Sequence, residues 1–239
     1  MKSLHLGEVE YFRIPPHVTK GELELKLDQV GLASNELVMA ALKEAESVHH
    51  HELPRHSGAH VLEEHIYPVA RLALEYQLFQ QNKGNSQFLN LSPEGIVVAL
   101  QHETFDRAII TREEFDRKYS SNIGNMVWLL GDVRYLLAGA RDYREKTEMK
   151  FEALKTAPWQ VQVAGLADKV NNTLCLYTPP YLDDSGQPTP RMKRAIGHVV
   201  NIALPVADLV SHDFFAPMLR EELDYYRKKY PHEFSHLKF

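Results

Sequence analysis

The sequence has almost no capacity for disulfide bonding, because Cys175 is the single cysteine among its 239 residues. One cysteine cannot form a disulfide within the chain, so a reducing compartment is the simpler expectation. The amino-terminal stretch MKSLHLGEVEYF lacks the apolar core of a signal peptide. No segment approaches the roughly 20 consecutive apolar residues that a membrane-spanning helix needs. These absences predict a cytoplasmic protein without a membrane partner.

An excess of positive charge is also missing. The chain has 27 Lys and Arg residues against 32 Asp and Glu residues, a formal net charge of −5. Such a chain has no broad basic face, so duplex nucleic acid is not an expected partner. A local basic pocket for a phosphorylated small molecule remains compatible with this charge, and so does an oligomer. Apolar residues at 44% are ordinary for a globular protein, and the length allows a sizeable core.

Strand patterns are scarce, and helical spacing of apolar residues dominates. The alternating residues 22–27 fit either a strand or a helix that begins after Thr19. Asn35 is typical of a helix N-cap. The apolar run 95–100 is compatible with a buried strand or helix, and the preceding Ser92-Pro93-Glu94 favours a helix.

Further helical patterns follow along the chain. They cover about residues 62–80, 111–119, 122–140, 141–157 and 161–176, and a long helix from about Pro190. Pro205 is expected to kink that last helix, because proline lacks an amide donor. The end of the chain resembles a solvated helix end. The sequence therefore predicts an all-α fold.

Residues suited to metal binding occur in three helical segments. They are His65, the pair His102-Glu103 and Asp168. Imidazoles with carboxylates suit a divalent cation such as manganese, iron or zinc. Each residue alone is more often a solvated acid or a hydrogen-bonded histidine, so only their order within a longer pattern is informative. The histidines at 49–51 are interpreted as a flexible loop.

The longer pattern consists of short motifs in a fixed order. They are Arg55-His56-Ser57-Gly58, His65 with Val69-Ala70, Ala99-Leu100-Gln101-His102-Glu103, Ile110-Thr111-Arg112-Glu113-Glu114-Phe115, Tyr143-Arg144-Glu145-Lys146, Leu166-Ala167-Asp168-Lys169-Val170-Asn171-Asn172-Thr173 and Ala203-Leu204-Pro205-Val206-Ala207. This set resembles the hydrolase domain of the RelA/SpoT-type alarmone enzymes, which are HD-domain metal phosphohydrolases. The resemblance is to the stand-alone small form, because no synthetase region follows. It spans about residues 35–215, and the motif that begins at Leu166 is its most specific part.

The resemblance implies an HD-domain helical bundle over residues 35–215. Residues 1–34 are then an amino-terminal extension, and residues 216–239 a carboxyl-terminal helical tail. It also implies one divalent metal ion. Manganese is the first expectation, with iron, zinc, nickel or magnesium as alternatives. The implied ligands are His65, His102, Glu103 and Asp168.

The implied substrate is (p)ppGpp, from which the family removes the 3′-pyrophosphate to leave GDP or GTP. Glu103 and Asp106 are the implied catalytic carboxylates, with Asp106 orienting the attacking water. The residues implied to contact the nucleotide are Arg55, Ser57, Tyr143, Arg144, Lys169 and Asn172.

The sequence departs from the family pattern at three places. Glu103 stands where the family has an aspartate. Asp106-Arg107 stands where it has Glu-Asp, which reverses the second charge. The spacing between Gly58 and His65 is one residue longer, and His56 replaces the common lysine. These departures leave two alternatives open, an HD nucleotidase or phosphodiesterase for another nucleotide and a nucleotide-binding module without catalysis.

Overall fold

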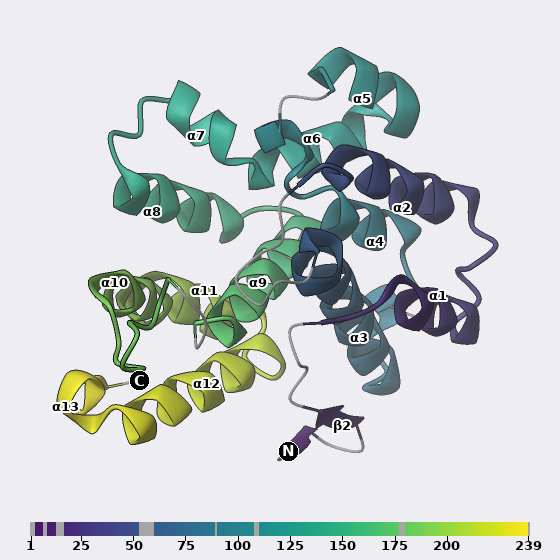
Figure 1. Cartoon of the computed structure of the whole chain (residues 1–239). Coiled ribbons are helices and arrows are strands. Elements are labelled where there is room, and N and C mark those ends of the chain that lie inside the picture. Colours follow the sequence, from purple (N-terminus) through teal and green to yellow (C-terminus); the bar gives the residue numbers. More distant parts are fainter. Residues whose placement is uncertain are drawn as a thin grey trace.

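The computed structural model describes residues 17–52, 60–88, 90–107, 110–176 and 180–238, together with the backbone of two strands. The strands, β1 (Ser3–Leu6) and β2 (Val9–Phe12), form an antiparallel hairpin that the sequence did not predict. Figure 1 shows that the other labelled elements are all helices. The predicted all-α class is confirmed, with the hairpin as its exception.

Most of the helices are short, and only a few exceed three turns. The α-helices are α1 (Lys20–Gln29), α2 (Glu36–His49), α3 (Tyr67–Asn82), α4 (Pro93–Leu100), α5 (Arg112–Tyr119), α6 (Ser121–Leu130), α7 (Asp132–Leu137), α8 (Tyr143–Leu154), α9 (Trp159–Leu174), α10 (Pro190–His198), α11 (Leu204–Val210), α12 (Phe215–Lys229) and α13 (Pro231–Phe234). Shorter turns of other helical types are η1 (Leu62–Ile66), η2 (Ser86–Phe88), η3 (Thr104–Arg107) and η4 (Val199–Ala203).

The ambiguous segment before residue 35 forms a helix, α1. Thr19 and Glu22 make a capping box, in which the two side chains satisfy each other's backbone N–H groups. Leu23 and Leu27 are fully buried, and α1 packs against α3. This segment therefore contributes to the same apolar core as the later helices.

α9 lies at the centre of the bundle, with α3 and α4 packed against it (Figure 1). The buried residues 95–100 lie in α4, a helix whose first turn is capped when Ser92 accepts the Gly95 N–H at 3.3 Å. In α9, Gly165 permits close packing, because a Cβ there would lie 2.8 Å from Leu154 Cδ1 on α8. Side chains on these helices therefore have closely defined positions.

Two of the shorter turns, η1 and η4, are π-helical. η1 carries His65 directly before α3. η4 carries Asn201 and joins α10 to α11 immediately before Pro205, so the helix is interrupted where the proline predicted a distortion. π-helical turns are rare and often occur at functional sites, so η1 and η4 each mark a region where a functional site is expected.

The carboxyl-terminal region packs more closely than expected. Tyr226 on α12 is fully buried, and its hydroxyl donates to the Thr173 carbonyl of α9 at 2.9 Å. The expected solvated helix end is therefore limited to Lys228 and Lys229, which are exposed. Among the described residues, no helix has both the length and the apolar character that crossing a membrane requires.

Candidate metal centre

Three elements from distant parts of the chain bring His65, His102 and Asp168 together. His65 lies on η1, His102 follows the end of α4, and Asp168 lies in the middle of α9. The end of α4 is fixed by Gln101, whose buried amide donates to the Ala41 carbonyl of α2 at 2.7 Å. The three side chains are thus placed by packed helices, which position a site more accurately than loops do.

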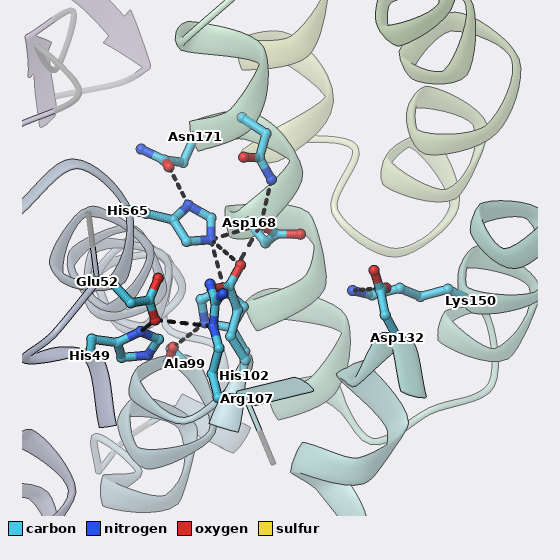
Figure 2. A network of polar contacts seen from close by, with 12 residues as sticks. His49, Glu52, His65, Ala99, His102, Arg107, Asp132, Lys150, Asp168 and Asn171 are labelled. Atoms are coloured by element: carbon cyan, nitrogen blue, oxygen red, sulfur yellow. Dashed lines mark hydrogen bonds and ion pairs between the residues drawn. The ribbon is translucent and has the colours of Figure 1, made fainter. Parts of the chain in front are cut away.

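The ligand atoms of these residues converge (Figure 2). The Nε2 atoms of His65 and His102 are 3.0 Å apart, and Asp168 Oδ1 lies 3.3 Å from the first and 3.9 Å from the second. All three ligand atoms lie within 4.8 Å of one another. Two nitrogens bound to one ion at about 2.1 Å and at a right angle are about 3.0 Å apart. The donor set therefore fits a single divalent cation.

The second nitrogen of each imidazole is held by an acceptor. His65 Nδ1 lies 2.7 Å from Asn171 Oδ1, and His102 Nδ1 lies 2.7 Å from the Ala99 carbonyl oxygen. Each Nδ1 therefore donates its hydrogen, which leaves each Nε2 as an acceptor. Between neutral imidazoles, two such lone pairs facing each other at 3.0 Å repel unless a cation, either a metal ion or a proton, lies between them. Metal-binding histidines have this arrangement of donors and acceptors.

The surrounding charges keep these ligands in forms that bind a cation. Burial, reinforced by His65, lowers the pKa of His102 to about 4, so its imidazole is neutral at neutral pH. Burial opposes the ionisation of Asp168, but nearby positive charge, chiefly that of Lys150, outweighs it and lowers the Asp168 pKa. A neutral imidazole and an ionised carboxylate are the forms that bind metals.

Glu103, the fourth predicted ligand, contacts both His65 and the positively charged side chain of Arg107. Its Oε1 lies 3.2 Å from His65 Nε2, and its Oε2 accepts from Arg107 Nη2 at 2.6 Å. Arg107 Nε lies 3.1 Å from Glu52 Oε1, and Glu52 pairs in turn with His49. Two carboxylates therefore surround Arg107, and Glu103 lies outside the three residues whose ligand atoms converge.

Asp106, the predicted water-orienting carboxylate, lines a cavity beside the ligand residues, but its carboxylate already has a structural partner. Its Oδ1 accepts the backbone N–H of Val133 in the first turn of α7 at 2.9 Å. No side chain caps α7 from its own N-cap position, because Gly131 stands there. Asp106 therefore supplies a helix cap from η3.

A cavity of about 120 Å³ opens beside the ligands, and lysines form its opposite side. Lys146 Nζ donates to Asp132 Oδ2 at 2.5 Å, and Lys150 Nζ lies 3.8 Å from Asp132 Oδ1. Figure 2 shows Asp132 and Lys150 across the site from the histidines. Lys169 Nζ lies 5.6 Å from the centre of the Phe151 ring.

Burial and charge act differently on these lysines. Burial opposes the charge of Lys150, but the carboxylates of Asp168 and Asp132 outweigh it and raise the Lys150 pKa. For Lys169, burial is the larger effect and lowers the pKa. Ammonium groups opposite a cation-binding site suit an anionic ligand, such as a phosphate, that bridges the two.

The predicted substrate residues fall into three groups. Lys169 and Asn172 line the cavity, and Asn172 Nδ2 donates to Asp168 Oδ1 at 2.5 Å. Arg144 does not line it, since it donates to Glu148 at 2.7 Å with 76% of its side chain exposed. The remaining predicted residues lie outside the described part of the structure: Arg55, Ser57 and the side chain of Tyr143.

The sequence reasoning missed several residues of the site. Lys146 and Lys150 are four residues apart, a spacing that places both on one face of a helix and was an available signal. Asn171 lies within the most specific motif but had no predicted role. A flexible loop was the interpretation for residues 49–51, and it is wrong for His49, which is fully buried at the end of α2.

No protein-family model matches the chain, and no curated protein is similar to it in sequence. The likeness to alarmone hydrolases therefore rests on the ordered motifs alone.

Proposed function

We propose that this chain is a metal-dependent phosphohydrolase of the HD type that acts on a nucleotide. The observation that carries the proposal is the pair of Nε2 atoms of His65 and His102, which face each other at 3.0 Å beside Asp168. Both imidazoles have their other nitrogen held by an acceptor. A cation between these atoms removes the repulsion and makes use of the buried carboxylate.

The proposed cofactor is one divalent ion, with manganese tested first and iron, zinc, nickel and magnesium after it. His65, His102 and Asp168 would hold it, with Glu103 as a fourth ligand if it leaves Arg107. When bound, such an ion lowers the pKa of a water ligand and polarises a phosphoryl oxygen. On the other side of the cavity, Lys150 and the neighbouring Lys146 offset the negative charge of the phosphoryl group.

The size of the cavity bears on the substrate. A volume of about 120 Å³ is well below the roughly 300–1,000 Å³ of sites that enclose a drug-sized ligand. The cavity therefore suits a phosphoryl group and leaves the rest of the substrate outside. The motif likeness makes (p)ppGpp the first nucleotide to test, with loss of its 3′-pyrophosphate as the reaction. Such a substrate is compatible with a cytoplasmic location.

A second candidate is a nucleotide-binding module without catalysis. It is favoured by two contacts that occupy the predicted catalytic carboxylates. Arg107 holds Glu103 at 2.6 Å, and Asp106 accepts the Val133 N–H at 2.9 Å. Under this alternative the protein binds nucleotides but does not hydrolyse them.

The deciding experiment uses tag-free protein. Metal content is measured by elemental analysis, and release of phosphate or pyrophosphate is followed with added manganese over a nucleotide panel that includes ppGpp. About one bound metal ion with pyrophosphate release from ppGpp supports the family reaction. Release from other nucleotides alone retains the hydrolase and changes the substrate. Nucleotide binding without metal or release overturns the hydrolase and favours the binding module.

A further inference from the structure

A second and larger hollow lies beside the candidate metal centre. This groove, of about 810 Å³, is formed by α8 on one side and by α10, η4 and α11 on the other. Its volume is within the range of sites that enclose small organic ligands. Phe151 of α8 lines both the groove and the metal cavity. One ligand can therefore occupy both if its phosphate enters the cavity and a bulkier part lies in the groove.

The lining of the groove combines an apolar floor with polar groups. Phe151, Ile202 and Val206 supply apolar surface, while Arg194 and Asn201 supply hydrogen-bonding groups. Arg194 is exposed and forms no ion pair within the described part of the chain. A flat apolar ring system with polar edges matches such a lining, because its faces pack on the floor and its edges hydrogen-bond.

The wall formed by η4 supports a binding role. The π-helical turn places Asn201 and Ile202 at the groove, and Asn201 Nδ2 donates to the Gly197 carbonyl at 2.8 Å. The other π-helical turn, η1, carries the metal-ligand candidate His65. Such turns are rare in helices and recur at functional sites, and here one carries a metal-ligand candidate while the other lines the groove, which is consistent with one continuous substrate site.

We propose that the groove between α8 and η4 binds the nucleoside part of the substrate, and that the phosphate to be hydrolysed lies in the cavity beyond Phe151. This rests on the proposed function for the identity of the cavity ligand. It places the nucleoside against Ile202 and Val206, with Arg194 available to its polar edges or to a second phosphate.

Gly197 offers a direct test, because a Cβ at this position meets nothing within 4 Å and Gly197 lines the groove. Gly197→Phe fills the groove without altering a metal ligand or a cavity lysine. Gly21→Phe is the matched control, since Gly21 lies in α1 and its Cβ also meets nothing within 4 Å. Binding of AMP, GMP, CMP, UMP and inorganic pyrophosphate is measured by calorimetry on the manganese-supplemented protein.

The expected result is selective. Gly197→Phe weakens nucleotide binding at least about tenfold, which corresponds to about 1.4 kcal/mol, while pyrophosphate affinity and metal content match those of the unaltered protein. Gly21→Phe changes none of them. Unchanged nucleotide affinity in Gly197→Phe overturns the proposal, as does an unaltered protein that binds pyrophosphate but no nucleotide. If Gly197→Phe does not fold, Arg194→Met replaces it, and unchanged nucleotide affinity there overturns the proposal.

Failure of the groove and failure of the hydrolase are distinguishable. Pyrophosphate hydrolysis without nucleotide binding removes the groove proposal and retains the metal centre. Nucleotide binding that depends on Gly197, without metal or hydrolysis, retains the groove and removes the hydrolase.

Discussion

The two sides of the candidate metal cavity are built differently. The ligand wall (His65, His102, Glu103 and Asp168) comes from the centre of the bundle, and both of its imidazoles are fixed at their second nitrogen. The lysine wall (Lys146 and Lys150) comes from α8, at the margin of the bundle in Figure 1. It is held by Asp132, whose side chain is 40% exposed.

The difference separates two tasks. The ligand wall is preorganised by core packing, because its side chains come from buried parts of the bundle. The lysine wall is placed by an ion pair that a phosphate can replace, because ammonium groups pair equally with carboxylates and phosphates. Metal binding should therefore depend on the first wall, and anion binding on the second.

The largest effect should come from breaking the ligand wall with Asp168→Asn. The substitution keeps the shape and the acceptor for the Asn172 amide but removes the negative charge. We expect metal affinity to fall by more than about 100-fold, beyond the 10–100-fold typical of changes around a metal ligand. Phosphate release should be lost with it. Elemental analysis and a release assay measure both.

Asp213→Asn is the control for this change. Asp213 is also partly buried and ion-paired, to Lys83 at 2.6 Å, but lies outside the cavity. It should retain metal and activity, and circular dichroism should show both variants to be helical. An Asp168→Asn protein that retains its metal would rule out the proposed centre.

The second largest effect should be a loss of kcat/KM when the lysine wall is altered by Lys150→Met. Lys150→Met removes an ammonium whose pKa is raised, because nearby carboxylates outweigh its burial. We expect kcat/KM to fall about 100-fold, as for loss of a group that stabilises developing charge, with metal content unchanged. Lys43→Met, on the exposed side of α2, should behave as the unaltered protein. Loss of metal in Lys150→Met would contradict the separation of the two walls.

The two walls also differ in how far the sequence predicts them. His65, His102 and Asp168 combine metal-ligand residue types with a motif order, and the structure brings all three together. Lys146 and Lys150 lie on a helix rich in charged residues, where most lysines are solvated. Only the packing of α8 against α6 and α9 reveals that these two face the cavity.

In the fold, too, the sequence predicts local features but not those that depend on tertiary packing. Caps and periodicity predict α4 and the interruption before Pro205, because both follow from local chemistry. The role of Arg107 depends on Glu52, which lies far from it in the sequence, and the burial of His49 depends on tertiary packing. Local patterns do not carry this information.

The third prediction concerns Arg107, whose guanidinium group pairs with Glu103 of the ligand wall. At an effective dielectric constant of about 20, two unit charges roughly 5 Å apart repel by about 3 kcal/mol, and a divalent ion doubles this. Loss of the orientation of Glu103 costs about 1–3 kcal/mol, so repulsion is the larger effect. We therefore expect Arg107→Met to tighten manganese binding about tenfold after solvent screening, and Arg107→Lys to change it less. Weaker binding in a manganese titration of Arg107→Met would show that Arg107 acts mainly by orienting Glu103.

The fourth prediction concerns the stability of the metal-free protein as the pH falls. Burial and the neighbouring His65 lower the folded-state pKa of His102 from its usual 6.5 to about 4. Between these values the unfolded chain binds a proton that the folded chain does not, so the free energy of unfolding decreases as pH falls from about 6.5 to about 4. The decrease contributed by this group is about 3 kcal/mol.

Urea unfolding at pH 7, 6, 5 and 4 measures this decrease in the free energy of unfolding. His102→Gln should lose this part of the slope, and His232→Gln, on α13, should keep it. Over the same range Lys150 stays charged because its pKa is raised, so acid should weaken the ligand wall and leave the charge of Lys150 intact. An equal slope in His102→Gln would show that this imidazole is not held neutral in the fold.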